Sequence, residues 1–515
     1  MAMVAMATIA THDGPSVTMV FSSRRFFSHD GVGSAEVRVD EVDLVVVGFG
    51  GAGAAAAITA HDAGATVVVC EKQAADAHTP STRMSGGLVM AVDSAPDGAA
   101  YLDACAGGMV PADVTAAWAE SATDVLDWLR KTAGLTFSCI NTAEHPELPG
   151  ASGVGVHQPG DAAFRLDPSA GAGDALFAAV AAAVRSREIE VRWSTPAQRL
   201  IVEDGRVVGV QTAGGPIRAR RGVVLTCGGY EFDENLKRDN LRAYPVHFYG
   251  NPGNTGDGVR MAQAAGAGLW HMNSMVGRAI GHFPLESAEG GWLNFIISID
   301  PPGHVIADRH GERYADETMQ AQLLHGFYYE MLRYDYERAE YSRIPSWWVF
   351  DERRRAAGPL TLAHIGAVKV GLYDWSADNS AEIERGWIAR GDTPFEAAVA
   401  AGMEDPEALA RSVAEYNAAC AAGVDPLGRA AETLVPLDSP PYYCVPVYPG
   451  GSNTCGGPVR DAGSRVLDPY DVPIPGLYAA GELGQPVGML YPADGANLSE
   501  AFCFGRIAAT TALSD

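Results

Sequence analysis

The chain has 515 residues, which at roughly 150 residues per domain corresponds to about two to four domains. It carries 63 acidic and 37 basic side chains, and the resulting net charge of −26 argues against nucleic acids and anionic membrane surfaces as partners. No stretch reaches the ~18 consecutive apolar residues of a membrane span. The eight cysteines show no metal-ligand spacing, so we expect reduced core thiols and no metal site.

The first predicted segment is a flexible N-terminal arm over residues 1–38. Residues 23–27 (SRRFF) look like a twin-arginine export signal. Such a signal needs an apolar segment after the arginines, and residues 28–31 (SHDG) follow instead. We therefore expect the protein to stay in the cytoplasm.

A dinucleotide-binding fingerprint follows the arm. Residues 42–47 (VDLVVV) form a β-branched run typical of a buried parallel strand, and residues 48–53 (GFGGAG) satisfy GxGxxG. Small residues then open a helix. A second predicted strand, 66–70, ends at Glu71, eighteen residues beyond Gly53, where a carboxylate would bind a ribose diol. The pyrophosphate is expected at the helix N-terminus.

Two later segments indicate that the dinucleotide is FAD. Residues 81–87 (STRMSGG) follow the second strand, and residues 474–482 (IPGLYAAGE) form a strand that enters a glycine turn before a last helix near residue 497. A chain that returns so late to complete its first domain suits a long, extended cofactor. Between them, residues 199–212 predict a hairpin on Asp204-Gly205.

The predicted cofactor-binding residues are Gly48, Gly50, Gly51, Ala52, Gly53, Glu71, Lys72, Ser81, Thr82, Arg83, Ser85, Gly86, Gly87, Cys227, Gly228, Gly229, Asp257, Gly481, Glu482, Asn497, Leu498 and Ser499.

These segments, in this order, resemble the flavoprotein family of fumarate reductases and 3-ketosteroid dehydrogenases. Further matching segments are VVLTCGGYEFDEN (223–235), NTGDGVRMAQAAGA (254–267), GERYADE (311–317) and NTCGGPV (453–459). The resemblance implies an α/β fold, in which a Rossmann-type FAD-binding domain, split in sequence, carries an inserted α+β substrate or cap domain. The implied division is 39–275 and 436–515 for the FAD-binding domain and 276–435 for the cap.

The fumarate reductase branch fits poorly. Its members hold a dicarboxylate with two His and one Arg and donate a proton from a second Arg, because a buried dianion must be neutralised. The proton-donor position, eight residues after Arg313, is Ala321 here, and two of the clamp positions are Asn453 and Asn497. Arg278 matches the remaining position. Fumarate reduction is therefore not expected.

The ketosteroid dehydrogenase branch fits at two places. Residues 491–495 (YPADG) resemble its YPxxG segment, in which the Tyr hydroxyl and the Gly backbone N–H bind the substrate ketone. For this chain that implies Tyr491 and Gly495 as an oxyanion hole. Residues 145–150 (HPELPG) resemble its YPELPG-like segment, which places His145 at a site position.

The general base of that branch is missing. In that branch the base is a tyrosine about eight positions after the arginine that corresponds to Arg313. At this place the present chain has Gln320-Ala321. Nearby candidates are Tyr314, Tyr328, Tyr329, His282 and His145. The predicted catalytic set is Tyr491, Gly495, His145, Tyr328, His282 and Arg278, the last as an anchor for a substrate carboxylate.

The sequence thus predicts an FAD-dependent dehydrogenase or reductase that introduces or removes a C=C bond next to a ring ketone. Alternatives are a desaturase of small keto acids such as oxocyclohexane carboxylate, a reductase of unsaturated carboxylates, and a flavin electron carrier without catalysis. Pro80 fills the position of the attaching histidine in succinate dehydrogenases and His78 lies two residues away, so FAD is expected to be non-covalent. No second Rossmann fingerprint appears, which favours an external electron acceptor such as a quinone.

Overall fold

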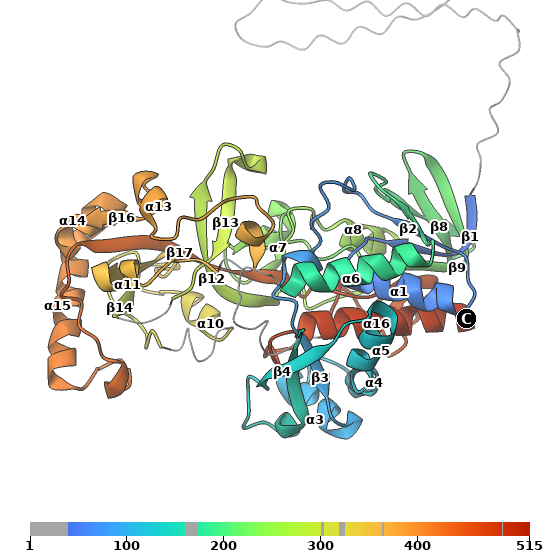
Figure 1. Ribbon diagram of the computed structural model, residues 1–515, viewed down its shortest axis with the longest axis horizontal. Helices are drawn as coiled ribbons and strands as arrows, with labels where there is room; N and C mark the ends of the chain where they lie inside the picture. Colours follow the sequence, from blue (N-terminus) through green and yellow to red (C-terminus); the bar gives the residue numbers. More distant parts are fainter. Residues whose placement is uncertain (1–39, 161–171, 300–302, 319–324, 363–364, 487) are drawn as a thin grey trace, which may run out of the picture. The chain divides into compact units, whose positions relative to one another are not determined.

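The computed structural model describes residues 40–160, 172–299, 303–318, 325–362, 365–486 and 488–515 (Figure 1). The predicted arm over 1–38 and position Ala321 lie outside these residues. Within the described ranges, no helix has the length and apolar character needed to span a membrane.

The first sheet begins with the predicted buried strand. β1 (Asp40–Val47) pairs in parallel with β2 (Val67–Cys70) and β9 (Gly215–Leu225), and β6 (Glu190–Arg192) extends the sheet beyond β2. Alternate side chains of β1 enter two different hydrophobic clusters, one on each face of the sheet. Burial on both faces explains why this strand is a continuous apolar run rather than an alternating one. The crossover from β1 to β2 is helix α1 (Gly51–Asp62).

The predicted hairpin joins this sheet at β9. β7 (Arg199–Glu203) and β8 (Arg206–Thr212) are antiparallel, and β8 continues the ladder onto β9. Asp204 and Gly205 both have positive φ, 49° and 77°. Two successive residues of positive φ form the tight turn that an Asp-Gly pair favours.

The C-terminal part of the chain completes the first sheet. β20 (Pro473–Ala479) pairs in parallel with β9, β19 (Arg465–Leu467) pairs antiparallel to β20, and α16 (Ala496–Ser514) packs along α1 (Figure 1). A Cβ at Gly505 would lie 2.5 Å from the carbonyl oxygen of Ala52, so the two helices approach closely only because this residue is glycine. The split Rossmann-type FAD-binding fold is confirmed.

A second sheet, in the order β13-β12-β17-β15-β14, joins residues from the middle of the chain. These five strands, antiparallel to their neighbours, are β12 (Met275–Pro284), β13 (Trp292–Ile296), β14 (His304–Ala307), β15 (Ser346–Asp351) and β17 (Tyr442–Thr454), with β10 (His247–Phe248) and β16 (Ala389–Gly391) at its sides. The 13-residue β17 lies at its centre, in the sequence predicted to open the second part of the FAD-binding domain. The division at 275 and 435 stays a prediction.

Smaller elements surround the two sheets. A three-stranded sheet is formed by β3 (Val89–Val92), β5 (Val154–Pro159) and β4 (Phe137–Thr142), and a pair by β11 (Leu269–Trp270) and β18 (Gly457–Pro458). The other α-helices are α2 (Ser81–Met84), α3 (Ala95–Ala106), α4 (Ala112–Ala122), α5 (Val125–Ala133), α6 (Ala172–Ser186), α7 (Glu234–Asn240), α8 (Asp257–Ala264), α10 (Phe327–Met331), α11 (Glu352–Ala356), α12 (Gly366–Lys369), α13 (Ser380–Glu384), α14 (Pro394–Ala401) and α15 (Pro406–Ala422).

Candidate active site

The turn between β1 and α1 has no room for a side chain at its first and last glycines. Gly48 has a φ of +101°, and a Cβ there would lie 2.5 Å from the carbonyl oxygen of Thr226 at the end of β9. A Cβ at Gly53 would lie 2.0 Å from the carbonyl oxygen of Gly48. The first glycine thus permits the turn and the last lets α1 start directly against it, which leaves the N-terminus of α1 open to an anion.

Glu71 follows β2, as the sequence predicts, and is held by backbone N–H groups. Its Oε2 accepts a hydrogen bond from Phe49 at 2.8 Å and its Oε1 one from Gln73 at 2.7 Å. Burial opposes ionisation of Glu71, but the nearby His78 ring and these two N–H groups outweigh it and hold the pKa of the carboxyl below its usual value. The residue is therefore a fixed carboxylate beside the glycine turn, suited to a ribose diol.

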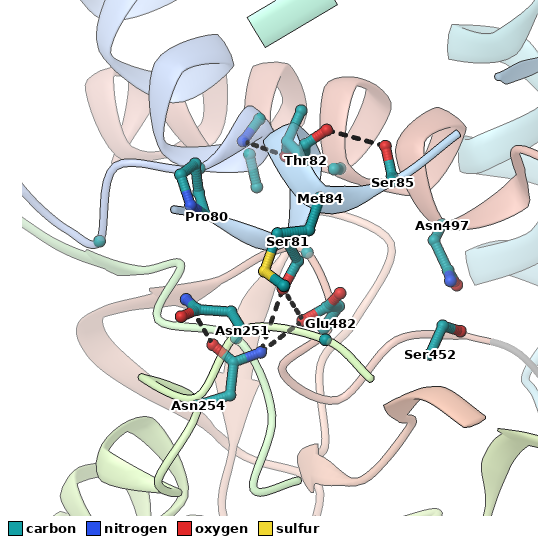
Figure 2. A pocket seen from close by; sticks show the side chains of 18 of the residues that line it. Pro80, Ser81, Thr82, Met84, Ser85, Asn251, Asn254, Ser452, Glu482 and Asn497 are labelled. Atoms are coloured by element: carbon teal, nitrogen blue, oxygen red, sulfur yellow. Dashed lines mark hydrogen bonds between the residues drawn. The ribbon is translucent and has the colours of Figure 1, made fainter. Parts of the chain in front are cut away.

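A cavity of about 340 Å³ runs along this turn to the N-terminus of α16 (Figure 2). It is lined by all predicted cofactor-binding residues except Gly53, Arg83, Gly229 and Ser499. Arg83 instead pairs through Nε with Asp174 at 2.6 Å, and the hydroxyl of Ser499 accepts a hydrogen bond from Trp118. Residues from β1, β2, the 81–87 segment, the loop after β9 and the C-terminal helix thus converge on one space.

A buried acid lies in the wall of the cavity. Oε2 of Glu482 contacts the hydroxyl of Ser81 at 3.2 Å and accepts a hydrogen bond from the side-chain amide of Asn254 at 3.0 Å (Figure 2). Burial, and then the charge of Glu231, raise the pKa of Glu482 to about 8. A neutral acid donates a hydrogen bond at neutral pH, so Glu482 presents a donor as well as an acceptor here.

Tyr491 lies at the far end of the cavity, beside the N-terminus of α16. Its hydroxyl accepts a hydrogen bond from the backbone N–H of Asn497 at 3.2 Å. Gly495, the N-cap of α16, has a φ of 84°, and a Cβ there would lie 2.6 Å from the carbonyl carbon of Leu88. Burial raises the pKa of Tyr491, opposed by the Asn497 N–H, so its hydroxyl keeps its proton. Both predicted oxyanion-hole residues line the cavity.

Arg278, on β12, also lines the cavity. Its Nη2 is 3.5 Å from Oδ1 of Asp494, and its buried Nε finds no hydrogen-bond acceptor among the described residues. An arginine with spare donors in a cavity wall is suited to a carboxylate.

Asn453 and Asn497, at two positions that carry charged clamps in the fumarate reductase branch, bind each other. The side-chain amide of Asn497 donates to Oδ1 of Asn453 at 2.7 Å. Both side chains are neutral, so they supply no charge to compensate a dianion.

Three predicted catalytic residues do not line the cavity. His282 stacks on His247 at 3.7 Å and bonds to Asn294 at 2.7 Å. Tyr328 is 2% exposed and packs against Gly277, with its hydroxyl unpartnered among the described atoms. His145 lies near the cavity but contacts the carboxylate of Glu147 at 3.9 Å. Tyr314, another candidate base, bonds to Ser346 at 2.7 Å, also outside the cavity lining.

His325, which was not predicted as a site residue, lines the cavity with a side chain that is only 7% exposed. Its Nδ1 is 2.9 Å from Oε2 of Glu144, and its ring centroid is 4.5 Å from that of Tyr491. His325 and Glu144 are 181 residues apart, and no motif marks either of them. The only sequence signal for His325 is its place four residues after Ala321, the position at which the tyrosine base of the ketosteroid dehydrogenase branch is missing.

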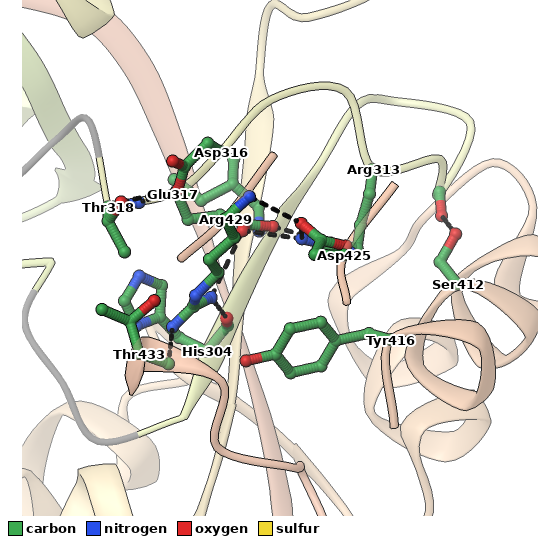
Figure 3. Close-up of polar contacts among 12 residues, drawn as sticks. His304, Arg313, Asp316, Glu317, Thr318, Ser412, Tyr416, Asp425, Arg429 and Thr433 are labelled. Atoms are coloured by element: carbon green, nitrogen blue, oxygen red, sulfur yellow. Dashed lines mark hydrogen bonds and ion pairs between the residues drawn. The ribbon is translucent and has the colours of Figure 1, made fainter. Parts of the chain in front are cut away.

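Arg313, the reference point for that position, belongs to a buried charge network instead (Figure 3). Its guanidinium binds Glu317 at 2.7 Å and Asp425 at 2.9 Å, and Arg429 reaches Glu317 at 3.2 Å. Both arginines stack over the ring of Tyr416. The network fastens the irregular segment that leads to residue 318 onto the segment after α15.

These features fit FAD. The glycine turn, the fixed carboxylate of Glu71 and the α1 N-terminus supply the contacts of an adenosine diphosphate moiety, and the same cavity continues to Tyr491. Pro80 offers no nucleophile, and the ring of His78 is buried and stacked on Phe49 at 5.6 Å. The non-covalent attachment expected from the sequence stays a prediction.

Comparisons with known proteins agree with this geometry. The family model described as "FAD binding domain" matches residues 43–498. The 3-oxosteroid 1-dehydrogenase of Mycolicibacterium smegmatis is 28% identical, over 91% of this chain and 96% of that protein. The 4-oxocyclohexanecarboxylate 2-dehydrogenase of Sinomonas cyclohexanicum is 27% identical, over 91% of this chain and 92% of that protein.

A solved structure is similar over nearly the same length. The 3-ketosteroid delta1-dehydrogenase from Sterolibacterium denitrificans, in complex with 1,4-androstadiene-3,17-dione, superposes with a TM-score of 0.78, at 25% identity, over 93% of this chain and 100% of that one. The predicted resemblance is confirmed. The chain belongs to the FAD binding domain family and is an FAD-dependent oxidoreductase.

Proposed function

We propose that the protein introduces a C=C bond next to a ring ketone, as a 3-oxosteroid dehydrogenase does, or reduces such a bond. The observation that supports this most is the position of Tyr491 and Gly495 at the N-terminus of α16, in the wall of the cavity that also holds the glycine turn. When bound, FAD supplies the two-electron acceptor or donor for a hydride.

The side chains do the rest of the chemistry. The Tyr491 hydroxyl and the Gly495 N–H bind the ketone oxygen, where negative charge develops as the ketone enolises. The α16 N-terminus adds its partial positive charge to the same place. Enolisation acidifies the adjacent C–H, and the neighbouring carbon can then release hydride.

A desaturase of small cyclic keto acids is the second candidate. The position of Arg278 in the cavity wall supports it, because its ion pair with Asp494 is long, at 3.5 Å, and a guanidinium there would anchor a substrate carboxylate. In either case we propose an external electron acceptor such as a quinone. We also propose a cytoplasmic location, because the spacing of the cysteines in the sequence predicts reduced thiols.

The test is anaerobic titration of the purified flavoprotein. A saturated 3-oxosteroid and 4-oxocyclohexanecarboxylate are added separately, and loss of the visible flavin absorbance is followed. Bleaching by the steroid supports the first candidate, and bleaching by the keto acid alone supports the second. If neither ketone bleaches the oxidised flavin, and neither of the corresponding unsaturated ketones reoxidises the reduced flavin, the proposed ketone chemistry is wrong.

A further inference from the structure

We propose that His325, oriented by Glu144, is the acid–base residue that exchanges the α proton of the substrate. This rests on the proposed ketone chemistry and supplies the base that the sequence analysis could not assign. The position eight residues after Arg313 holds an alanine, so a proton acceptor must come from elsewhere in the cavity wall.

The geometry fixes which nitrogen is basic. An ionised carboxylate only accepts hydrogen bonds, so at 2.9 Å Nδ1 of His325 donates to Oε2 of Glu144 and carries the proton of the neutral ring. Nε2 is then left with the lone pair. Burial opposes ionisation of Glu144, but the contact with His325 outweighs it and keeps the pKa of this carboxyl below its usual value.

The dyad is anchored to the oxyanion-hole segment. The backbone N–H of Glu144 donates to the carbonyl of Pro492 at 3.1 Å, directly after Tyr491. The rings of His325 and Tyr491 are 4.5 Å apart and tilted by 54°. A ketone whose oxygen is bound by Tyr491 therefore presents its α carbon within a short distance of the imidazole, as general base catalysis requires.

The remaining charged groups around the dyad are few. His145 follows Glu144 in the chain, Arg278 lies on β12, and Asp494 precedes the α16 N-terminus. His325 lines this end of the cavity, and because its Nδ1 is committed to Glu144, its Nε2 is the nitrogen that can exchange a proton with the substrate.

The α C–H proton moves to Nε2 while the ketone becomes an enolate held by Tyr491 and Gly495. When bound, FAD would take up the hydride that the adjacent carbon loses, with its two electrons, and the C=C bond would form as the ketone is restored. The imidazolium releases its proton to solvent before the next turnover, and in the reductive direction it donates that proton.

The test compares anaerobic flavin bleaching by a 3-oxosteroid, or by 4-oxocyclohexanecarboxylate, across pH 5–9 in the wild type and variants. His325→Asn keeps an amide donor toward Glu144 but has no basic nitrogen. We expect its bleaching rate to fall by about 10²–10⁴-fold with the flavin spectrum and substrate affinity unchanged. The wild-type rate should decline toward acidic pH as the imidazole protonates, and this decline should disappear in His325→Asn.

Glu144→Gln should move the acidic decline to lower pH, because the imidazolium loses its ion pair. His310→Asn is the matched control, since His310 forms a similar pair with Glu340 at 2.6 Å away from the cavity, and its rates should equal those of the wild type. Exchange of the α hydrogens for deuterium in D₂O should be lost in His325→Asn.

A His325→Asn variant that bleaches within a few-fold of the wild type, or keeps its acidic decline, would overturn the assignment while leaving the proposed function intact. A wild type that no ketone bleaches would remove the proposed function, and the role of the dyad with it.

Discussion

The hydroxyl of Tyr491 accepts a hydrogen bond from the backbone N–H of Asn497, 3.2 Å away in the first turn of α16. The tyrosine is thus fixed by the helix whose N-cap is Gly495. A donor held by backbone has little freedom to reorient, and such preorganisation is what makes an oxyanion hole effective.

Replacing Tyr491 with Phe should therefore slow ketone-driven flavin bleaching by about 10²–10³-fold. Rapid-mixing absorbance under anaerobic conditions measures the rate. Tyr336→Phe is the control, because Tyr336 is 88% exposed and should give the wild-type rate. Equal rates for the two variants would show that the Tyr491 hydroxyl does not bind the reacting ketone.

Gly53→Ala should yield protein that lacks most of its flavin. The added Cβ would lie 2.0 Å from the carbonyl oxygen of Gly48, so α1 must move away from the turn. Gly64→Ala is the control, since Gly64 has a φ of +90° but nothing within 4 Å of the added atom. The ratio of flavin to protein absorbance after purification decides between them. Full flavin content in Gly53→Ala would contradict the close packing.

Glu482→Gln should raise the free energy of unfolding of the flavin-stripped protein, relative to the wild type, by more at pH 8 than at pH 5. Burial and Glu231 raise the pKa of Glu482 to about 8, so the folded chain keeps a proton that the unfolded chain releases near pH 4–5. At this residue the unfolded state binds fewer protons in this window, so Glu482 makes the wild-type free energy of unfolding fall as pH rises, by about 1 kcal/mol per pH unit. The neutral amide removes that slope. Urea unfolding at several pH values measures it, and parallel curves for both proteins would refute the buried neutral acid.

Arg278→Met should separate the two substrate candidates. If the guanidinium anchors a carboxylate, the variant should bind 4-oxocyclohexanecarboxylate about 10–100-fold more weakly, while 3-oxosteroid binding stays within a few-fold. Spectral titration of the bound flavin gives both affinities. An equal loss for both ligands would mean that Arg278 supports the cavity wall rather than recognising a carboxylate.

Arg313→Met should lower the free energy of unfolding by about 3–5 kcal/mol, because it leaves Glu317 and Asp425 buried without that partner. Arg338→Met, which removes a surface pair with Asp335, should cost less than about 1 kcal/mol. Denaturant titration compares the two. Similar losses would show that the network adds no more than a surface pair.

The parts of the fold that could be predicted from sequence are those set by local residues. The β-branched run over 42–47, the GxGxxG turn and the Asp204-Gly205 hairpin each depend on neighbours in the chain, and all three are present. The contact of Glu144 with His325 depends on tertiary structure, since the two residues are 181 positions apart in the chain and meet directly, at 2.9 Å. The spacing from Arg313 does not lead to this contact, because Arg313 belongs to a separate buried charge network.

The central placement of β17 escaped prediction for a similar reason. Its sequence, YYCVPVYPGGSNT, is apolar enough for any buried strand, and nothing in it selects one sheet over another. Its partners are strands from 275–284 and 346–351, so its position follows from long-range pairing alone.

The closure of the first sheet by β20 and α16 has a consequence for how the protein is made. The glycine turn before α1 is translated long before β20, the strand beside β9, and α16, the helix beside α1. Until β20 has been made, the part of β9 that pairs with it lacks this partner strand. The cofactor pocket and the oxyanion hole can therefore be completed only after α16 has been made, and a chain that stops before residue 496 lacks the helix N-terminus that both of them use.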